Sequence, residues 1–212
     1  MKIGILGSGA VATTLGSGFL KHGHHVMMGT RHKEKLNTWI AQYPKGIVGS
    51  FEDAGRFGDV VVLAVKGSAA VSALKETRPG SLDGKTVIDT TNPIADEPPV
   101  NGVLKFFTTL DDSLMERLQR EFPAAHFVKA FNSVGNASMV EPAFKIGPPT
   151  MFICGNDDGA KATVKGILDQ FGWETADMGK AEAARAIEPL CMLWCIPGFL
   201  RQDWVHAFKM VS

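Results

Sequence analysis

Apolar residues follow two alternating patterns along this chain: short unbroken runs, and longer stretches in which they recur every three or four positions. Short runs are typical of buried strands, whereas the longer spacing is typical of amphipathic helices. The patterns predict eight strands, at 3–6, 25–28, 47–48, 60–65, 86–89, 126–131, 150–154 and 173–176. They predict helices at 10–21, 33–43, 68–77, 113–121 and 158–171, and a helical tail beyond the last strand.

Strands and helices that alternate in this way predict an α/β fold, with a doubly wound, mostly parallel sheet covered by helices on both faces. The run at 60–65 has six apolar residues and no polar one, which indicates a strand buried on both sides. Ser68 is expected to cap the helix that follows it. In such a sheet the binding crevice lies at the carboxyl ends of the strands. The segment 91–110 is rich in turn signals, and we expect a long functional loop there.

A glycine-rich segment lies between the first predicted strand and the first predicted helix. It matches the dinucleotide fingerprint G-x-G-x-x-G/A, with Gly7 for a tight turn and Gly9 for the close approach of a pyrophosphate. The N-terminus of the following helix offers free N–H groups and a positive dipole end to phosphates. The predicted cofactor site therefore includes Gly7, Ser8, Gly9, Ala10, Val11 and Ala12. We expect residues 1–178 to form a Rossmann-type dinucleotide-binding domain, and 179–212 a helical extension packed on it.

The end of the second predicted strand indicates which dinucleotide binds. An NAD site usually has an acidic residue there for the ribose 2′-hydroxyl. This chain has Thr30 and Arg31 instead, with Lys33 and Lys35 close behind. Arg31 can bind a 2′-phosphate through two parallel hydrogen bonds and can stack on adenine. These residues favour NADP over NAD, and Thr30, Arg31 and Lys35 join the predicted site.

Charge and cysteine content narrow the class of protein. Of 212 residues, 45% are apolar and 21% charged, and 22 basic residues balance 22 acidic ones, so no overall positive field exists to gather nucleic acid. Three cysteines without a disulfide framework indicate a reduced, cytoplasmic chain. Cys191 and Cys195 are expected to be buried apolar side chains rather than a redox pair. No apolar run reaches the ~20 residues of a membrane span, and no cluster has metal-ligand spacing, so neither a membrane nor a metal is expected.

Several motifs together resemble those of the coenzyme F420-dependent NADP oxidoreductase family, and the chain is also similar to the cytoplasmic reductase domain of the STEAP metalloreductases. The resemblance covers nearly the whole chain, and the last three of its six motifs are the more specific. The motifs are Gly-Ser-Gly-Ala-Val-Ala at 7–12, Gly-Thr-Arg at 29–31, Val-Leu-Ala-Val at 62–65, Asp-Thr-Thr-Asn-Pro at 89–93, Lys-Ala-Phe-Asn at 129–132 and Glu-Pro-Leu at 188–190.

The resemblance implies a hydride transfer between NADP(H) and a planar acceptor such as coenzyme F420 or a flavin, with stacked rings and no dedicated protein acid or base. Orientation would then supply most of the rate. Asn132 is the candidate catalytic residue, as a hydrogen-bond partner of the nicotinamide carboxamide, with turn capping as the alternative. Asp89 is expected to accept backbone N–H bonds rather than to donate a proton. The other predicted cofactor contacts are Ala64, Val65, Lys66, Asn92, Pro93 and Ala130.

Two other functions fit the same fingerprint. A non-catalytic NADPH-binding regulatory or redox-sensing protein would need the same cofactor site, but the segments 91–110 and 132–142 exceed what nucleotide binding requires and favour an acceptor site. A dehydrogenase with a large helical substrate domain would need more than the roughly 35 residues that follow the last predicted strand. The tail is rich in aromatic and methionine residues, which are enriched at interfaces, and we expect it to take part in a homodimer.

Overall fold

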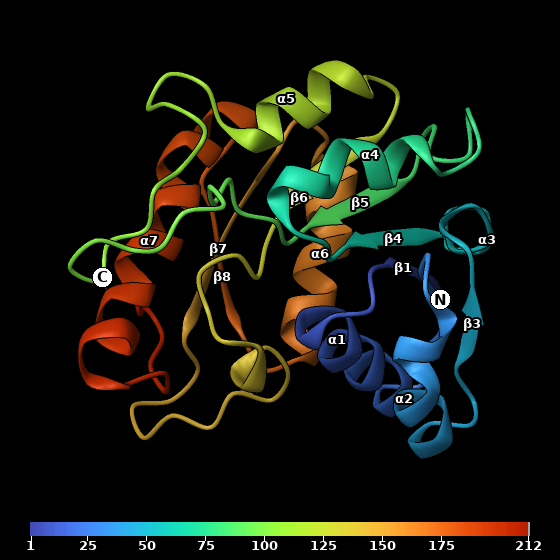
Figure 1. Cartoon of the computed structure of the whole chain (residues 1–212), viewed down its shortest axis with the longest axis horizontal. Helices are drawn as coiled ribbons and strands as arrows, with labels where there is room; N and C mark the ends of the chain where they lie inside the picture. The colour runs from blue at the N-terminus through green and yellow to red at the C-terminus, as the bar shows by residue number, and fades with distance from the viewer. Residues whose placement is uncertain (212) are drawn as a thin grey trace.

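The computed structural model describes residues 1–211 and contains an eight-stranded sheet in the order β3-β2-β1-β4-β5-β6-β7-β8 (Figure 1). Neighbouring strands are parallel except β6 and β7, which are antiparallel. The strands are β1 (Lys2–Leu6), β2 (His25–Gly29), β3 (Ile47–Gly49), β4 (Val60–Leu63), β5 (Thr86–Asp89), β6 (His126–Lys129), β7 (Thr150–Gly155) and β8 (Glu174–Asp177). The strand order reverses between β1 and β4, which is where such sheets bind ligands.

Alternate residues of the central strands face two separate cores. In β4, Val60 and Val62 pack into one core, and Val61 and Leu63 into the other. Helices α1 (Ala10–Lys21), α2 (Asn37–Gln42) and α6 (Asp158–Gln170) cover the first core. Helices α3 (Phe51–Phe57), α4 (Ala70–Lys75) and α5 (Leu114–Glu121), with the start of α7 (Ala184–Arg201), cover the second. Because a strand alternates its side chains between faces, an unbroken apolar run supplies both cores at once.

Helix α3 is not predicted by the sequence patterns above. It begins with a capping box, in which Ser50 Oγ accepts from the Asp53 N–H at 3.1 Å and Asp53 Oδ2 accepts from the Ser50 N–H at 2.9 Å. This reciprocal pairing satisfies two N–H groups that a helix start leaves without partners. The Ser-x-x-Asp spacing is therefore the signal that could have revealed α3.

Several predicted elements are shorter in the structure. Strand β4 ends at Leu63 and β6 at Lys129, two residues earlier than expected in each case. The helices predicted at 33–43 and 68–77 each divide into a 3₁₀ turn, η1 (Lys33–Leu36) or η2 (Gly67–Ala69), and a short α-helix. Ser68 lies inside η2 and makes no capping bond, so its predicted role is wrong. Ala64 and Val65 leave the sheet and line the crevice at its edge.

The tail is only partly helical. The turn η4 (Ala181–Ala183) leads into helix α7, whereas the turn η3 (Asn136–Ser138) lies earlier, between β6 and β7. Helix α7 continues through both of its prolines and ends at a left-handed residue, Gln202. Beyond it, Trp204 folds back onto Gly198, where a Cβ would lie 2.2 Å from the indole ring. The chain then runs beside β7, with the Thr150 N–H donating to the carbonyl of Phe208 at 2.9 Å. The helical prediction is thus wrong for 202–211, and Ser212 lies outside the described residues.

The segment Ala181–Arg201 is long and apolar enough to cross a membrane by length and composition. The expectation above rests on unbroken apolar runs and so misses this segment, in which Glu182, Arg185 and Glu188 interrupt the apolar residues while the average stays apolar. The same test is met by core helices of soluble proteins, and 33% of the segment is buried against the rest of the chain.

Candidate functional site

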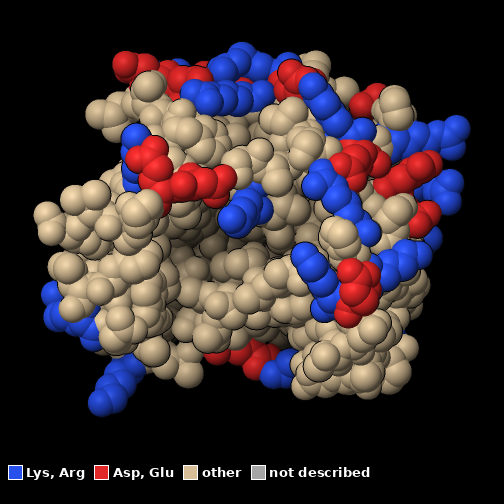
Figure 2. Space-filling model, in the orientation of Figure 1, with Lys and Arg blue, Asp and Glu red and all other residues tan. Residues whose placement is uncertain are grey.

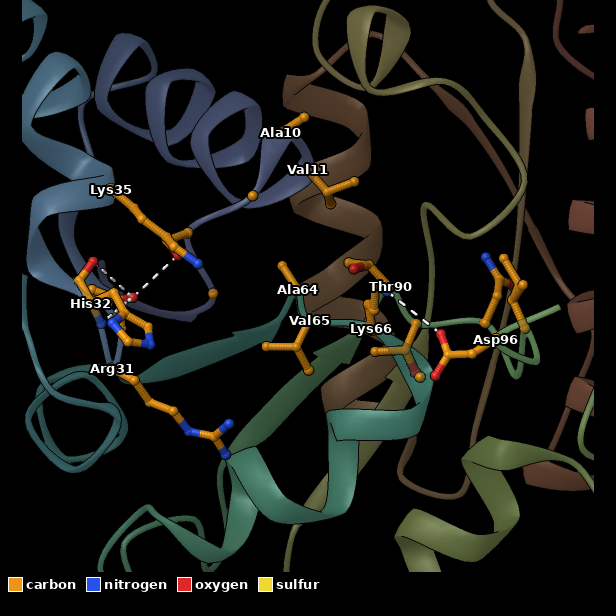
Figure 3. Close-up of a pocket in the computed structure, with 18 of the residues that line it drawn as sticks. Ala10, Val11, Arg31, His32, Lys35, Ala64, Val65, Lys66, Thr90 and Asp96 are labelled. Carbon is orange, nitrogen blue, oxygen red and sulfur yellow. Dashed lines mark hydrogen bonds and ion pairs between the residues drawn. The ribbon is translucent and has the colours of Figure 1, made fainter. Parts of the chain in front are cut away.

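The carboxyl ends of β1, β2, β4 and β5 open into a crevice of about 950 Å³ (Figure 3). The space-filling view shows a hollow with an uncharged floor and charges of both signs along its rim (Figure 2). The predicted residues that line the crevice are Gly7, Ser8, Gly9, Ala10, Val11, Thr30, Arg31, Lys35, Ala64, Val65, Lys66 and Asn92. The structure thus brings together residues from four separate strand ends.

The two fingerprint glycines serve different needs. Gly7 has φ +147°, and a Cβ there would lie 2.2 Å from the carbonyl oxygen of Ala64, so the turn itself requires glycine. A Cβ on Gly9 would meet no protein atom within 4 Å, and Gly9 borders the crevice. The absence of a side chain at Gly9 therefore leaves open the space in front of the α1 N-terminus. Ala12 is fully buried and packs α1 on the sheet, behind the crevice wall.

At the end of β2, two of the predicted phosphate-binding residues, Thr30 and Arg31, already have side-chain partners within the chain. Thr30 Oγ1 donates to Ser8 Oγ at 3.1 Å and accepts the His32 N–H at 3.1 Å. Arg31 forms an ion pair with Glu76, with its Nε 2.8 and 3.0 Å from the two carboxylate oxygens. The Arg31 guanidinium lies over the ring of Phe51, with Cζ 5.7 Å from the centroid. Arg31 is therefore held within the chain, whereas the sequence predicted a free fork.

The turn after β5 forms the middle of the crevice. Thr90 Oγ1 donates to the carbonyl of Leu63 at 2.9 Å. Asp89 Oδ1 accepts the backbone N–H of Thr91 at 2.9 Å and its hydroxyl at 2.7 Å. The predicted structural role of Asp89 is thus confirmed, and its turn presents Thr90 and Thr91 to the crevice.

Asn132 does not line the crevice but supports a residue that does. Its Nδ2 donates to Asn92 Oδ1 at 3.2 Å and to the carbonyl of Ile187 at 2.9 Å, and Asn92 Nδ2 donates back to the Asn132 carbonyl at 2.8 Å. Asn132 is buried, and its Oδ1 has no hydrogen-bond partner in the described chain. Pro93 and Ala130 are also buried behind the wall. Direct contact of these three with a cofactor stays a prediction.

A buried group of three charged side chains lies directly behind this turn. Lys129 Nζ is 2.6 Å from Asp89 Oδ2 and 2.9 Å from Glu188 Oε1, and it donates to the Thr91 carbonyl at 2.9 Å. Burial lowers the pKa of Lys129, but the two carboxylates outweigh it and hold that pKa above its ordinary value. Lys129 is therefore a permanent cation that anchors the crevice turn. Asp89, Lys129 and Glu188 each lie in a different sequence motif, and the distances between these motifs along the chain do not indicate that the three side chains meet.

Glu188 also joins the tail to helix α5. Its two carboxylate oxygens accept the N–H groups of Leu114 and Met115, each at 2.9 Å. These are among the N–H groups that the start of α5 leaves free, and a carboxylate there complements the helix dipole. Glu188 therefore connects α7, α5 and the turn behind the crevice.

The far part of the crevice is bordered by the segment 91–110, which folds back on itself. The Ala95 N–H donates to the carbonyl of Lys105 at 2.8 Å, and the Phe107 N–H donates to that of Pro93 at 2.9 Å. Across the mouth, Lys66 Nζ lies 3.5 Å from Asp96 Oδ1, and both side chains are exposed (Figure 3). The expected long loop is thus paired with itself by backbone hydrogen bonds, and we call the segment 91–110 the ribbon. The lining residues that the sequence analysis did not name as site residues are His32, Phe51, Gly67, Thr90, Thr91, Ile94, Ala95, Asp96 and Glu97, although Thr91 and 94–97 lie in the expected functional loop.

The cysteines lie away from this crevice. Cys154 is buried, and burial raises the pKa of its thiol to about 12. Cys191 is buried and Cys195 is half-buried in α7. Their burial agrees with apolar packing roles.

Comparison with known proteins connects this geometry to a family. The family model described as coenzyme F420-dependent NADP oxidoreductase matches residues 2–93. Among curated proteins, Metalloreductase STEAP3 of Rattus norvegicus is 30% identical over 206 residues, which are 94% of this chain and 39% of that protein. The chain therefore spans well under half the length of this relative.

Solved structures extend the likeness over the whole chain. A protein from Arthrobacter sp. FB24, named for an inferred F420-dependent NADP-reductase activity, superposes with a TM-score of 0.94 at 30% identity and full coverage of both chains. A reductive aminase from Aspergillus terreus, solved with NADPH and ethyl-5-oxohexanoate, gives a TM-score of 0.68 at 20% identity, covering 95% of this chain and 63% of that one. The second likeness shows the fold alone.

The predicted family and the predicted Rossmann-type sheet are both confirmed. The family model covers the fingerprint and the end of β2, and the full-length structural match covers the ribbon and the tail as well. From its fingerprint loop to its C-terminal helix, this chain belongs to the coenzyme F420-dependent NADP oxidoreductase family.

Proposed function

We propose that this protein transfers hydride between NADP(H) and a planar acceptor of the deazaflavin or flavin class. The observation that carries the proposal is the crevice itself, which continues from the fingerprint past Asn92 to the ribbon residues Ile94 and Ala95. A dinucleotide bound as the fingerprint requires would fill the part between Gly9 and Asn92. The space along the ribbon is left for a second ring.

The residues around the first part fit NADP(H). The open space at Gly9 and the N–H groups of α1 would hold the pyrophosphate. Thr30, Arg31 and Lys35 would contact the 2′-phosphate, because they supply a hydroxyl group and two basic groups at the adenine end of the crevice. The turn at Thr90 and Thr91 would then border the nicotinamide.

When bound, the nicotinamide supplies the hydride, and the reduced acceptor takes up a proton from solvent. The chain's part is orientation: the titratable side chains of the crevice, such as Lys66 and Asp96, are exposed at its rim. Asn132 would act as a positioning residue, because it holds both ends of the Asn92 amide. Such a site works by holding two rings in contact rather than by acid–base catalysis.

We also propose that the chain forms a homodimer through its tail, at the end of α7 and the segment that follows it. Leu193, Leu200 and Val205 are 55%, 55% and 78% exposed, and Leu200 contacts the loop at Gly102. The left side of the view in Figure 2, where α7 lies in Figure 1, is mostly uncharged and carries a few basic side chains. Apolar surface of this kind is typical of subunit interfaces. Light scattering would give the mass in solution, and a monomer at micromolar concentration would contradict the proposal. A cytoplasmic location remains a prediction.

An acceptor screen tests the proposed activity. NADPH oxidation would be followed with coenzyme F420, FAD, FMN, ferric chelates and quinones, each at the same concentration. We expect turnover with a deazaflavin or a flavin, because the crevice continues past Asn92 along Ile94 and Ala95 and leaves room for a second ring. NADPH binding without turnover on any acceptor would favour a non-catalytic NADPH-binding protein instead.

The substitution Gly9→Val tests the cofactor site. We expect NADPH binding to be lost while the fold is kept, because a Cβ at this position meets no protein atom within 4 Å and the valine side chain would enter the space in front of α1. Gly166→Val is a matched control, since a Cβ there also meets no atom within 4 Å and the residue lies on α6. Fluorescence titration with NADPH measures binding, and circular dichroism checks the fold. Wild-type affinity in Gly9→Val would contradict the fingerprint assignment.

A further inference from the structure

The Arg31 guanidinium is the basic group best placed for a 2′-phosphate, yet most of its hydrogen-bond donors are in use. Its Nε faces both oxygens of Glu76, and its Nη2 bonds to the same carboxylate and lies 3.3 Å from Ser72 Oγ. A guanidinium has five N–H donors. With Nε and Nη2 engaged, only the two N–H groups of Nη1 remain for another anion.

This pair is accessible enough to be exchanged. The side chains of Arg31 and Glu76 are 47% and 42% exposed. Exposed ion pairs contribute little stability, because water competes for both partners. A phosphate dianion that entered the crevice could therefore displace the carboxylate, and it would be repelled by that carboxylate while doing so.

Among the described residues, Glu76 has no side-chain partner other than Arg31. It is the C-terminal cap residue of α4, where a negative charge is unfavourable to the helix dipole. Its bonds to side chains in the described chain go to Arg31. The packing of Arg31 over Phe51 is a second contact that holds the guanidinium at the crevice, and it does not involve the carboxylate.

We propose that Glu76 is a specificity-determining residue that acts through Arg31: it occupies the guanidinium in the free protein and competes with the 2′-phosphate of the cofactor. The inference rests on the proposed binding of NADP(H). Glu76 lowers the affinity for NADPH, leaves the affinity for NADH unaffected, and so reduces the preference between them. A lower affinity would let a reductase release its oxidised cofactor faster, since most affinity differences appear in the dissociation rate.

The test is Glu76→Gln, which keeps the size of the side chain and removes its charge. We expect NADPH to bind about two- to fivefold more tightly, the size of one exposed ion pair, with NADH binding unchanged. The gain should shrink in high salt. It should also vanish in the Arg31→Ala background, because Arg31 transmits the effect.

A matched control separates this role from general surface charge. Glu121, at the end of α5, forms an exposed ion pair with Lys75, the residue of α4 that precedes Glu76. The two charged atoms are 2.6 Å apart, and the pair lies outside the crevice. Glu121→Gln removes the same charge and should leave both affinities unchanged. An equal gain in the control, or a gain that persists with Arg31→Ala, would overturn the proposal.

Cofactor binding by the wild type and by Glu76→Gln separates the proposed function from the role of Glu76. If the wild-type protein binds no NADPH, the proposed function is wrong and this inference falls with it. If the wild type binds NADPH and Glu76→Gln binds it equally or more weakly, only the role of Glu76 is overturned. Isothermal titration with both cofactors distinguishes these results.

Discussion

Two groups of charged side chains at the crevice differ in their exposure to water. At the adenine end, Arg31 and Glu76 form a half-exposed pair. Behind the turn after β5, Lys129, Asp89 and Glu188 form a group that is almost entirely buried. The same chemistry therefore serves different purposes: the exposed pair can exchange partners with a ligand, whereas the buried group is part of the framework that places the turn.

The physical reason is desolvation. A buried charge that loses its partner keeps the full cost of leaving water, so the three buried groups depend on one another. An exposed charge that loses its partner is solvated at once. A partly buried pair, Glu116 with Arg185, lies between these limits, with side chains 9% and 39% exposed.

Lys129→Met should have the largest effect. It leaves Asp89 and Glu188 buried without a cation, which costs about 3–5 kcal/mol of folding free energy. Urea denaturation followed by circular dichroism would measure the loss. Lys165→Met is the control, because it makes the same change in an exposed pair with Asp169 and should shift the midpoint little. Equal midpoints for the two variants would contradict the distinction between buried and exposed charges.

Arg31→Ala should have the next largest effect, on binding rather than on folding. Loss of a charged hydrogen bond to the 2′-phosphate should weaken NADPH binding about 10- to 150-fold, with NADH nearly unchanged. The denaturation midpoint should stay close to that of the wild type, because the pair with Glu76 is exposed. Paired titrations measure both affinities. If both cofactors weaken equally, Arg31 stacks on adenine or supports the fold instead.

Glu116→Gln should have the smallest effect, and one that depends on pH. Hydrogen bonds from Arg185, opposed by burial and aided by Ser113, hold the pKa of Glu116 below its usual value. Since the folded pKa lies below the unfolded value of about 4.3, this carboxylate stabilises the fold above that pH and stops doing so as pH falls through the folded pKa. Thermal melts should show the variant less stable at pH 7 and equal to the wild type in strong acid. A difference that is the same at every pH would exclude the ion pair as its source.

Local patterns were sufficient for most of the sheet. Each of the eight predicted strands is present. The signal is strongest for central strands such as β4, because a strand buried on both faces needs apolar residues throughout and so shows as an unbroken run. The ends of β4 and β6 were placed too far along the chain, since apolar residues continue into the crevice wall and no local signal marks where strand pairing stops. Helix α3 was missed although the spacing of Ser50 and Asp53 indicates its start.

The tail shows where local patterns fail. Its apolar content predicts a helix to the end, yet the chain leaves the helix at Gln202 and pairs with β7 through Thr150. Trp204 decides this path by packing on Gly198, a contact between residues that no periodicity connects. Composition therefore indicates that the tail is packed against other parts of the protein, but it does not indicate which elements the tail contacts.

The sequence by itself determined the α/β fold, the fingerprint loop and the basic set at the end of β2, because each depends on residues that are close together in the chain. Only the tertiary structure decided which charges meet. Arg31 and Glu76 are 45 positions apart, and Asn92 and Asn132 are 40 apart. Lys129 finds Glu188 only because α7 returns to the carboxyl end of β6. Such pairings arise from the path of the chain through the sheet, and pairing in turn decides whether a charged side chain is free to bind a ligand or is fixed in the framework.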